Sequence, residues 1–425
     1  MTHQSQDKSS QAKPTILILT SGHQLYREYL LQSVAQHANV WLFHDREARW
    51  EKPYLLGHTV ISSQDTAGMV QAARSLPAEL QIAGVLCWNE MRMVQTAELA
   101  QALGLPCTTP ENVMRCRDKH LTREALAAHA VPQPASVLVG AVGEARKTAS
   151  LIGYPVIVKP RDMGASYGVS LVHNPEQLAL ALVHAQSARG KDVPQHERSV
   201  LVEEYMDGPE VSVDVAWWQG EMFPLYLARK VTGFYPHFEE VGHVVDAQDP
   251  LLHDFMFLDV LEKAHRAVGF QNGITHTELR LTPAGPKIVE INARLGGDMI
   301  PYVGWVASGI SPGQVAAEVA CGRRPNTSAT RKEVAAIRFL YPPHDAVVGC
   351  VRIDTSALPA SVETAAALAT PGQKLLLPPA EHVFGRYGYV VVHAATAEIC
   401  EAALTQAERA FTLEASPLSE PQERH

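Results

Sequence analysis

Short apolar runs alternate with longer amphipathic stretches over the first hundred residues. Residues 14–20 read Pro-Thr-Ile-Leu-Ile-Leu-Thr, a continuous apolar run of the kind found in buried strands. The same reasoning predicts strands at 40–43, 59–61 and 82–87, and helices at 24–37, 66–75 and 91–103. Strands that alternate with helices favour a parallel sheet with covered faces. The pattern therefore predicts a small α/β domain over residues 14–116.

After residue 117 the pattern changes to longer strands joined by turns. A helix at 119–129 ends before Pro132 and Pro134. The strands expected next are 155–159, 169–172, 199–203, 211–217, 221–228, 274–281 and 287–292, and the helices are 175–188, 253–268 and 312–321. A polar stretch after Pro325 indicates a linker, and a strand at 334–340 and a helix at 396–409 follow it.

These changes of pattern divide the chain into parts. The length of 425 residues corresponds to about three domains. The expected parts are a disordered tail at 1–13, the α/β domain at 14–116, a central region at 117–330, a C-terminal α+β domain at 331–415 and a tail at 416–425.

Composition narrows the class of protein. The chain has 45 acidic and 36 basic residues, a formal net charge of -9, and no long basic run. This disfavours non-specific binding to nucleic acid or to an anionic membrane surface. No apolar run approaches the roughly 20 residues of a membrane span, and the polar start lacks the apolar stretch of a signal peptide. Six widely spaced cysteines without zinc-site spacing indicate reduced thiols. We expect a cytoplasmic protein with no nucleic-acid or membrane partner.

Two common motifs are matched only in part. The run Gly-Ala-Ser-Tyr-Gly at 164–168 matches the nucleophile elbow Gly-x-Ser-x-Gly, but a strand-like segment follows where the elbow requires a helix. We therefore expect a loop at the tip of a β-hairpin rather than a serine hydrolase. Residues 140–148 resemble a P-loop, but Ala145 occupies the position of the second glycine. Nucleotide binding, if present, has to use other residues.

Two glutamates stand out in the hairpin predicted at 274–281 and 287–292. If Leu281 pairs with Lys287 across the turn, Glu278 lies opposite Glu290. Like charges directly opposite repel, so this register is poor unless a cation lies between them. A one-residue register slip would separate the two glutamates.

The neighbours of this pair favour a metal site. Because side chains alternate along a strand, Glu290, Asn292 and Arg294 share one face, with Ile288 as its apolar member. Two carboxylates and an amide oxygen suit Mg²⁺, which prefers oxygen ligands and recruits phosphate oxygens. A solvated acidic strand without a metal is the alternative, and the facing Glu278 favours the metal interpretation.

A second group of candidate residues lies upstream. An apolar strand ends in Lys159, and the small-residue loop 163–168 follows it. A lysine can bind phosphates, and an adjacent glycine loop can cover them. The alternative is a surface lysine, which is common at the end of a strand. The run Leu-Val-Glu-Glu-Tyr-Met at 201–206 then breaks before Glu210. Free backbone groups at this break can bind the edge of a purine, and the Glu210 carboxylate can bind ribose hydroxyls. The alternative is an ordinary strand and turn with no ligand.

Taken in order, these residues resemble the ATP-grasp superfamily. The resemblance covers essentially the whole chain and rests on Lys119, Lys159-Pro160, the 163–168 loop, Glu203-Glu204-Tyr205-Met206, Glu210, Glu278 and Glu290-Ile291-Asn292-Ala293-Arg294. The segments at 236–243, 276–280 and 289–298 are most similar to those of L-amino acid ligases. The resemblance implies an α/β (α+β) ATP-grasp fold with an N-terminal Rossmann-like pre-ATP-grasp domain and a C-terminal lid domain.

The resemblance also implies a role for each motif residue. The implied ATP contacts are Lys119, Lys159, Gly164, Ser166, Glu203, Tyr205, Met206 and Glu210. The implied ligands of two Mg²⁺ (or Mn²⁺) ions are Glu278, Glu290 and Asn292. Arg294 and His276 are the catalytic candidates, with Arg294 on the transferring phosphoryl group. The expected substrate contacts are Glu240, His243, Gly297 and Trp305.

A protein of this kind would activate a carboxylic acid as an acyl phosphate and join it to an amine. The resemblance implies small-molecule substrates, with amino acids in both positions, a peptide product, release of ADP and phosphate, and a homodimer. Two alternatives stay open. One is another ATP-grasp reaction, such as bicarbonate activation of the biotin carboxylase type or glycinamide-type ligation. The other is a nucleotide-binding regulatory protein without catalysis, against which the retention of Glu278, Glu290 and Arg294 argues.

Overall fold

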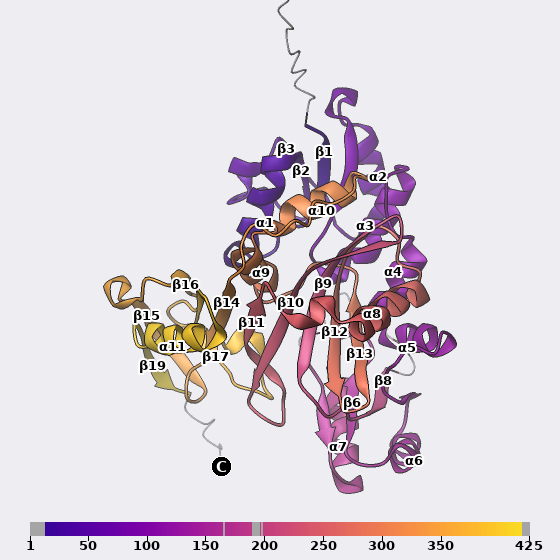
Figure 1. The fold of residues 1–425 in the computed structure, drawn as a ribbon, viewed down its shortest axis with the longest axis vertical. Coiled ribbons are helices and arrows are strands. Elements are labelled where there is room, and N and C mark those ends of the chain that lie inside the picture. Colours follow the sequence, from indigo (N-terminus) through magenta and orange to yellow (C-terminus); the bar gives the residue numbers. More distant parts are fainter. Residues whose placement is uncertain (1–12, 165, 189–195, 197–198, 419–425) are drawn as a thin grey trace, which may run out of the picture.

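Four β-sheets organise the residues that the structure, a computed structural model, describes: 13–164, 166–188, 196 and 199–418 (Figure 1). The tail expected at 1–13 lies outside these residues except for residue 13. Of the tail expected at 416–425, residues 416–418 are described, and a strand extends to Pro417. The fold is the mixed helix and strand arrangement that the sequence predicts.

The first sheet is parallel, as the alternation of strands and helices predicts. Its order is β3-β2-β1-β4, and every residue of β1 is buried because both faces are covered. Helix α10 comes from far along the chain and packs on α1, where the Ser33 and Ser311 hydroxyls lie 2.6 Å apart. The elements are β1 (Thr15–Leu19), α1 (Gln24–His37), β2 (Asn39–His44), β3 (Gly57–Val60), α2 (Thr66–Arg74), β4 (Ile82–Leu86), α3 (Met93–Ala102), α4 (Pro110–Arg117) and α10 (Pro312–Ala320).

A small antiparallel sheet follows, with the order β5-β8-β6-β7. Its elements are α5 (Lys119–Ala128), β5 (Ser136–Val139), α6 (Val142–Ile152), β6 (Val156–Pro160), β7 (Ser170–Val172), α7 (Pro175–Ser187) and β8 (Val200–Glu204). The P-loop-like run belongs mainly to α6, where Ala145 is fully buried against the sheet. The elbow-like run connects the paired strands β6 and β7, as expected for a hairpin loop, with residue 165 outside the described residues.

The largest sheet is antiparallel and contains the hairpin with the two glutamates. Its order is β13-β12-β9-β10-β11-β14-β18-β16. Helix α8 packs on β13, and helix α9 packs on β10, β11 and β14. The elements of its first part are β9 (Glu210–Trp218), β10 (Glu221–Gly233), β11 (Glu239–Asp246), α8 (Phe255–Val268), β12 (Gly273–Thr282), β13 (Gly285–Asn292) and α9 (Ile300–Ser308).

The C-terminal strands continue this sheet through the pairing of β14 with β11. Helix α11 covers β14 and β18, and a three-stranded sheet of order β17-β15-β19 lies beside them (Figure 1). The elements are β14 (Val334–Leu340), β15 (Ala346–Ile353), β16 (Val362–Ala367), β17 (Lys374–Leu375), β18 (Gly388–Ala394), α11 (Ala397–Glu408) and β19 (Phe411–Pro417). Because the sheet is continuous, the segment before β18 returns to the central region, where Arg386 pairs with Asp298.

The six cysteines are all free of disulfide bonds. In the described part of the chain, no helix combines the length and the apolar character needed to cross a membrane.

Candidate active site

A cleft of about 820 Å³ separates the small antiparallel sheet from the β12–β13 end of the large one. Most of the residues expected to bind nucleotide and metal line it: Lys119, Lys159, Gly164, Ser166, Glu203, Tyr205, Met206, Glu210, Glu278 and Glu290. Glu240, an expected substrate contact, also lines this cleft. Residues that are more than a hundred positions apart in the chain thus share one cavity.

A β-bulge in the β12–β13 hairpin determines how the two glutamates face each other. The turn differs from the expected register, because Leu281 pairs with Pro286 rather than with Lys287. The register shifts by one residue between Glu278 and Leu279, and this shift restores the expected pairing of Glu278 with Glu290. The bulge also corrects the expected position of Ile288, which is fully buried in the core instead of sharing a face with Glu290.

Arg123 stabilises this bulge, although the sequence analysis did not identify it. Its guanidinium donates to the carbonyl oxygens of Ile288 at 3.3 Å and Val289 at 2.7 Å. The same side chain donates to Glu203 at 2.7 Å. Arg123 therefore joins the irregular strand of the large sheet to strand β8 of the small one.

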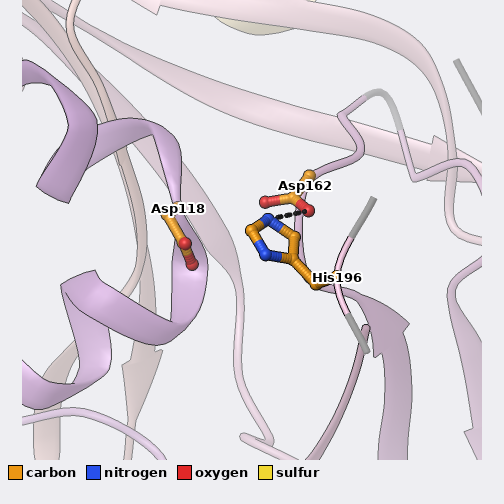
Figure 2. A group of neighbouring side chains, drawn as sticks. All are labelled: Asp118, Asp162 and His196. Atoms are coloured by element: carbon orange, nitrogen blue, oxygen red, sulfur yellow. Dashed lines mark ion pairs between the residues drawn. The ribbon is translucent and has the colours of Figure 1, made fainter. Parts of the chain in front are cut away.

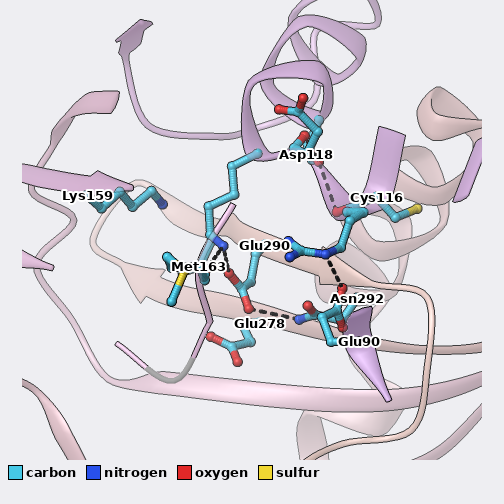
Figure 3. A network of polar contacts seen from close by, with 12 residues as sticks. Glu90, Cys116, Asp118, Lys159, Met163, Glu278, Glu290 and Asn292 are labelled. Atoms are coloured by element: carbon cyan, nitrogen blue, oxygen red, sulfur yellow. Dashed lines mark hydrogen bonds and ion pairs between the residues drawn. The ribbon is translucent and has the colours of Figure 1, made fainter. Parts of the chain in front are cut away.

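The two facing glutamates are surrounded by cations and amide donors. The Lys119 ammonium lies 2.9 Å from Glu290 Oε2, and the Asn292 amide donates to Glu290 Oε1 at 2.8 Å. Figure 3 shows Glu278, Glu290 and Asn292 close together, with Met163 nearby. The Lys119 ammonium also donates to the Met163 carbonyl oxygen. Burial would raise the pKa of Glu290, but the Lys119 charge together with the hydrogen bonds from Asn292 and Lys119 lowers it. Both carboxylates are therefore held in the charged form that a metal ion requires.

Lys230 on β10 is the central cation of the site, and sequence analysis missed it. Its ammonium lies 2.8 Å from Glu210, 2.9 Å from Glu240 and 2.8 Å from Glu278, and its side chain is 2% exposed. Burial would lower the pKa of Lys230, but the three carboxylates raise it well above its usual value. The same pairing holds the pKa of Glu278 well below its usual range despite burial.

Glu203, one of the implied ATP contacts, is already bound by protein cations. Its carboxylate binds Arg123 at 2.7 Å, the Lys159 ammonium at 2.7 Å and the Ser136 hydroxyl at 3.0 Å. Burial would raise its pKa, but the two cations lower it to about 2. Glu203 therefore orients Lys159 and Arg123 from below the cleft.

The glycine-containing loop is close to Lys119, which donates to the Met163 carbonyl oxygen at 2.5 Å. Gly168 ends the loop with a φ of +78°. A Cβ there would lie 2.5 Å from the Cβ of Ala188 and 2.7 Å from Cγ of Pro160, so only glycine fits. The loop is thus anchored at its end by close packing and at its start by Lys119.

A second cavity adjoins the cleft and contains the catalytic candidates. It is lined by Gly164, Ser166, Glu239, Glu240, His276, Glu278, Glu290, Arg294, Gly297, Asp298, Ile300 and Val383. Several of these residues also line the cleft, so the two spaces are continuous. A phosphate in the cleft and a small molecule in the second cavity could therefore meet between Glu278 and Glu290.

His276 in this cavity forms a buried pair with Asp214. Its Nδ1 lies 2.6 Å from Asp214 Oδ1, and its Nε2 lies 3.5 Å from Glu278 Oε1. Burial would lower the pKa of His276, but the Asp214 charge and hydrogen bond raise it to about 9. Asp214 also accepts the backbone N–H of Gly296 at 3.0 Å. His276 is therefore a cation at neutral pH, fixed beside the glycine turn of the site.

Arg294 reaches across to the N-terminal part of the chain. Its Nε lies 2.6 Å from Glu90 Oε2, and its Nη1 donates to the Leu295 carbonyl oxygen at 2.8 Å. The Glu90 charge raises the pKa of Arg294 although burial opposes it. The parallel sheet thus contributes a residue that orients the expected catalytic arginine.

Two expected substrate contacts lie elsewhere. His243 is fully buried behind the second cavity, with Nε2 3.4 Å from Glu240 Oε2 and 3.9 Å from Asp298 Oδ2. Trp305 lies on α9, packs against the core and contacts the ring of Tyr302, and it lines neither the cleft nor the second cavity. The aromatic residue expected in the pocket is thus a packing residue of the helix.

A group of potential metal ligands lies outside both cavities (Figure 2). His196 Nε2 lies 3.1 Å from Asp162 Oδ2, and Asp118 faces them across a gap. Asp118 already caps helix α5 and accepts two hydrogen bonds from Arg161. Helix capping and ion pairing account for these side chains.

Comparison with known proteins identifies the central part of the chain. Residues 152–302 match the ATP-grasp domain. The chain contains an ATP-grasp domain. This stretch runs from the end of α6 into α9 and includes Lys159, Glu203, Lys230 and both facing glutamates.

Proteins similar to this chain are found in bacteria and animals. An uncharacterized protein, y4rH, of Sinorhizobium fredii (strain NBRC 101917 / NGR234) is 26% identical over 81% of this chain and 71% of its own length. Carnosine synthase 1 of Homo sapiens is 25% identical over 58% of this chain, which spans only 31% of that protein. The crystal structure of an L-amino acid ligase from Bacillus licheniformis covers 96% of this chain and 100% of its own, with a TM-score of 0.78 and 20% identity. That last likeness establishes the shared fold.

Proposed function

We propose that this chain is an ATP-dependent ligase that activates a carboxylic acid as an acyl phosphate and joins it to an amine. The observation that carries the proposal is the pair of facing glutamates, Glu278 and Glu290, enclosed by Lys119 and Lys230 where two cavities meet. Opposed carboxylates surrounded by cations are costly to build for stability alone. They are useful where phosphoryl groups and metal ions bind together.

Nucleotide would bind in the larger cleft. Lys119 and Lys159 supply charge for the phosphates, with loop residues Gly164 and Ser166 over them. Strand β8 ends at Glu204, so Tyr205 and Met206 leave the sheet, and we assign their backbone to the adenine edge. Glu210 is assigned to the ribose. Glu203 acts indirectly by orienting Lys159.

The facing glutamates and their neighbour Asn292 are suitable ligands for divalent metal ions. Glu278, Glu290 and Asn292 provide hard oxygen ligands on one face of the hairpin, and the repulsion of directly opposed carboxylates is relieved by a cation between them. Mg²⁺ bound there would offset the charge on the phosphates during transfer. We assign two ions, Mg²⁺ or Mn²⁺, to this site.

The reaction takes place in two displacements. A carboxylate oxygen of the acid attacks the γ-phosphorus, the bond to the bridging oxygen breaks, and ADP leaves. The amine nitrogen then attacks the carbonyl carbon, the carbon–oxygen bond to phosphate breaks, and phosphate leaves with that electron pair while nitrogen loses a proton. Arg294 and cationic His276 lie where negative charge develops, and donors preorganised in this way lower the barrier. The loop at 163–168 would exclude water from the acyl phosphate.

We propose amino acids as both substrates, with a dipeptide as the product. The names of two similar proteins, carnosine synthase 1 and L-amino acid ligase, support this choice. Glu240 and Gly297 line the second cavity and are the proposed substrate contacts, with His243 acting behind Glu240. A cytoplasmic location and a homodimer stay predictions from the sequence.

Phosphate release tests this function. Purified protein with Mg²⁺ and ATP is assayed against pairs of amino acids, and against bicarbonate with biotin as the competing chemistry. Glu290→Ala and Arg294→Ala should each reduce amine-dependent phosphate release by about 100-fold or more, because each removes charge from the reacting centre. Lys263→Met, at an exposed helix pair, is the matched control and should keep full activity. Full turnover in either site variant would rule out the assignment.

A further inference from the structure

A third cavity of about 1060 Å³ adjoins the second one. It lies between helix α1, the glycine turn before α9 and the segment before β18, and its lining includes His23, Tyr26, Arg27, Phe384 and Arg386. Gly297, Asp298 and Val383 line both cavities, so the second and third cavities are continuous. A molecule in the third cavity could therefore extend an amine toward the carboxylate being activated.

The arginines around these cavities differ in how their charge is balanced. Arg386 is bound by both oxygens of Asp298, at 2.9 and 2.7 Å, and Arg294 is bound by Glu90. Arg280 is bound by Glu210 at 2.9 Å. Each of these guanidinium groups already has a carboxylate partner within the protein.

Arg27 is different. It is half-buried, its Nη1 donates to the Gly296 carbonyl oxygen at 3.3 Å, and it forms no ion pair with a carboxylate of the described residues. Burial lowers the pKa of Arg27 and the Arg294 charge acts in the same direction, while the charges of Asp298 and Asp214 oppose this shift only in part. A guanidinium in such a place has unused donors and gains most from an incoming anion.

We propose that Arg27 binds a free carboxylate of the amine substrate, so that the enzyme selects an α-amino acid or a peptide over a simple amine. This inference rests on the proposed ligase function. The carboxylate of the acid substrate is consumed between Glu278 and Glu290, so it is not available to Arg27. A planar guanidinium matches a carboxylate with two parallel hydrogen bonds. Tyr26 and Phe384 provide an aromatic wall for the remainder of the substrate.

Three amines that differ at one group test the proposal. The acid substrate and ATP are kept constant, and the amine is a free amino acid, the same amino acid as its primary amide, or hydroxylamine, which traps the acyl phosphate as a hydroxamate. For Arg27→Gln we expect the KM of the free amino acid to rise about 10- to 100-fold, the loss typical of a charge-assisted contact. The KM of the amide and the rate of hydroxamate formation should stay within about twofold of wild type, as expected where no such contact is lost.

Arg324→Gln is the matched control, because Arg324 is exposed and pairs with Glu221 away from the cavities. It should leave all three amines unaffected. Equal losses for all three amines in Arg27→Gln would overturn the proposal, as would a change confined to the KM of the acid. Wild-type protein that forms no hydroxamate with any acid would instead contradict the ligase function itself. Arg27→Lys should restore part of the affinity for the free amino acid, since it restores charge without the paired geometry.

Discussion

Replacing Lys230 with methionine removes the cation that three carboxylates share. Methionine has nearly the same length, so the variant keeps the packing of the stem and loses the charge. Breaking a buried ion pair costs about 3–5 kcal/mol of unfolding free energy. Here the three carboxylates stay in the site with fewer cationic partners, since among the described residues Glu210 keeps only Arg280 and Glu278 keeps only His276. Lys230 is 2% exposed and lies 2.8–2.9 Å from Glu210, Glu240 and Glu278, so the upper part of that range applies at pH 8.

The loss should depend on pH. Without Lys230, burial raises the folded-state pKa of these carboxyl groups above their unfolded-state values, so the variant loses further stability as pH rises. Urea unfolding of the nucleotide-free protein, followed by circular dichroism, should show a deficit about 1–2 kcal/mol smaller at pH 5.5 than at pH 8.

Lys263→Met provides the matched comparison for this experiment. Lys263 makes a single exposed pair with Asp259 at 2.7 Å, and its side chain is 58% exposed. Such pairs contribute about 0.3–0.5 kcal/mol. If Lys230→Met lost no more stability than Lys263→Met, Lys230 would not be the cation that stabilises the three carboxylates.

Other substitutions test the surroundings of the site. Glu203→Gln should destabilise the protein by about 3–5 kcal/mol at pH 7, because Arg123 and Lys159 lose a buried partner. The folded-state pKa of Glu203 is about 2. Its contribution to stability is therefore complete above its unfolded-state pKa and is lost as pH falls toward 2, so the loss of stability in the variant should be roughly 1 kcal/mol smaller at pH 4 than at pH 7. A loss that grew on acidification would contradict this. Gly304→Ala should destabilise by about 1–3 kcal/mol despite the helix preference of alanine, because the new Cβ would lie 2.4 Å from the Tyr226 ring; a higher melting temperature would refute the clash.

The facing glutamates could be predicted from the sequence, but the reason for their pairing could not. Alternation of side chains places Glu278 and Glu290 on strand faces, and any short hairpin brings them near each other. The turn closes one residue earlier than expected, and the bulge at Val289 compensates for the difference. The bulge depends on hydrogen bonds from Arg123, more than 150 residues away in the chain, which no local pattern reveals.

Lys230 was missed for a related reason. In the sequence it follows Arg229 in a long mixed strand, and only the sheet order places it beside the carboxylates of β9, β11 and β12. Glu203 lies on β8 of the small sheet, where Arg123 from α5 and Lys159 from β6 bind its carboxylate. Polar networks of this kind can be predicted only when the order of the strands is known.

Several elements were also missed because their local patterns are weak. Strand β11 contains Glu239, Glu240 and His243, which disguise a buried strand as a polar segment. Helix α9 is short, and Trp305 in it was assigned to a pocket from composition alone. In contrast, α1 was predicted with its observed bounds, and a fully apolar strand that ends at Leu19 precedes it.

The acyl-phosphate step can be tested most directly by following oxygen from the acid. An amino acid labelled with ¹⁸O in its carboxylate is incubated with the protein, Mg²⁺, ATP and an amine substrate, and the released phosphate is analysed by mass spectrometry. Transfer of one carboxylate oxygen to γ-phosphorus predicts one ¹⁸O atom in each phosphate formed, with ADP as the nucleotide product. Unlabelled phosphate, or AMP with pyrophosphate, would contradict the proposed mechanism.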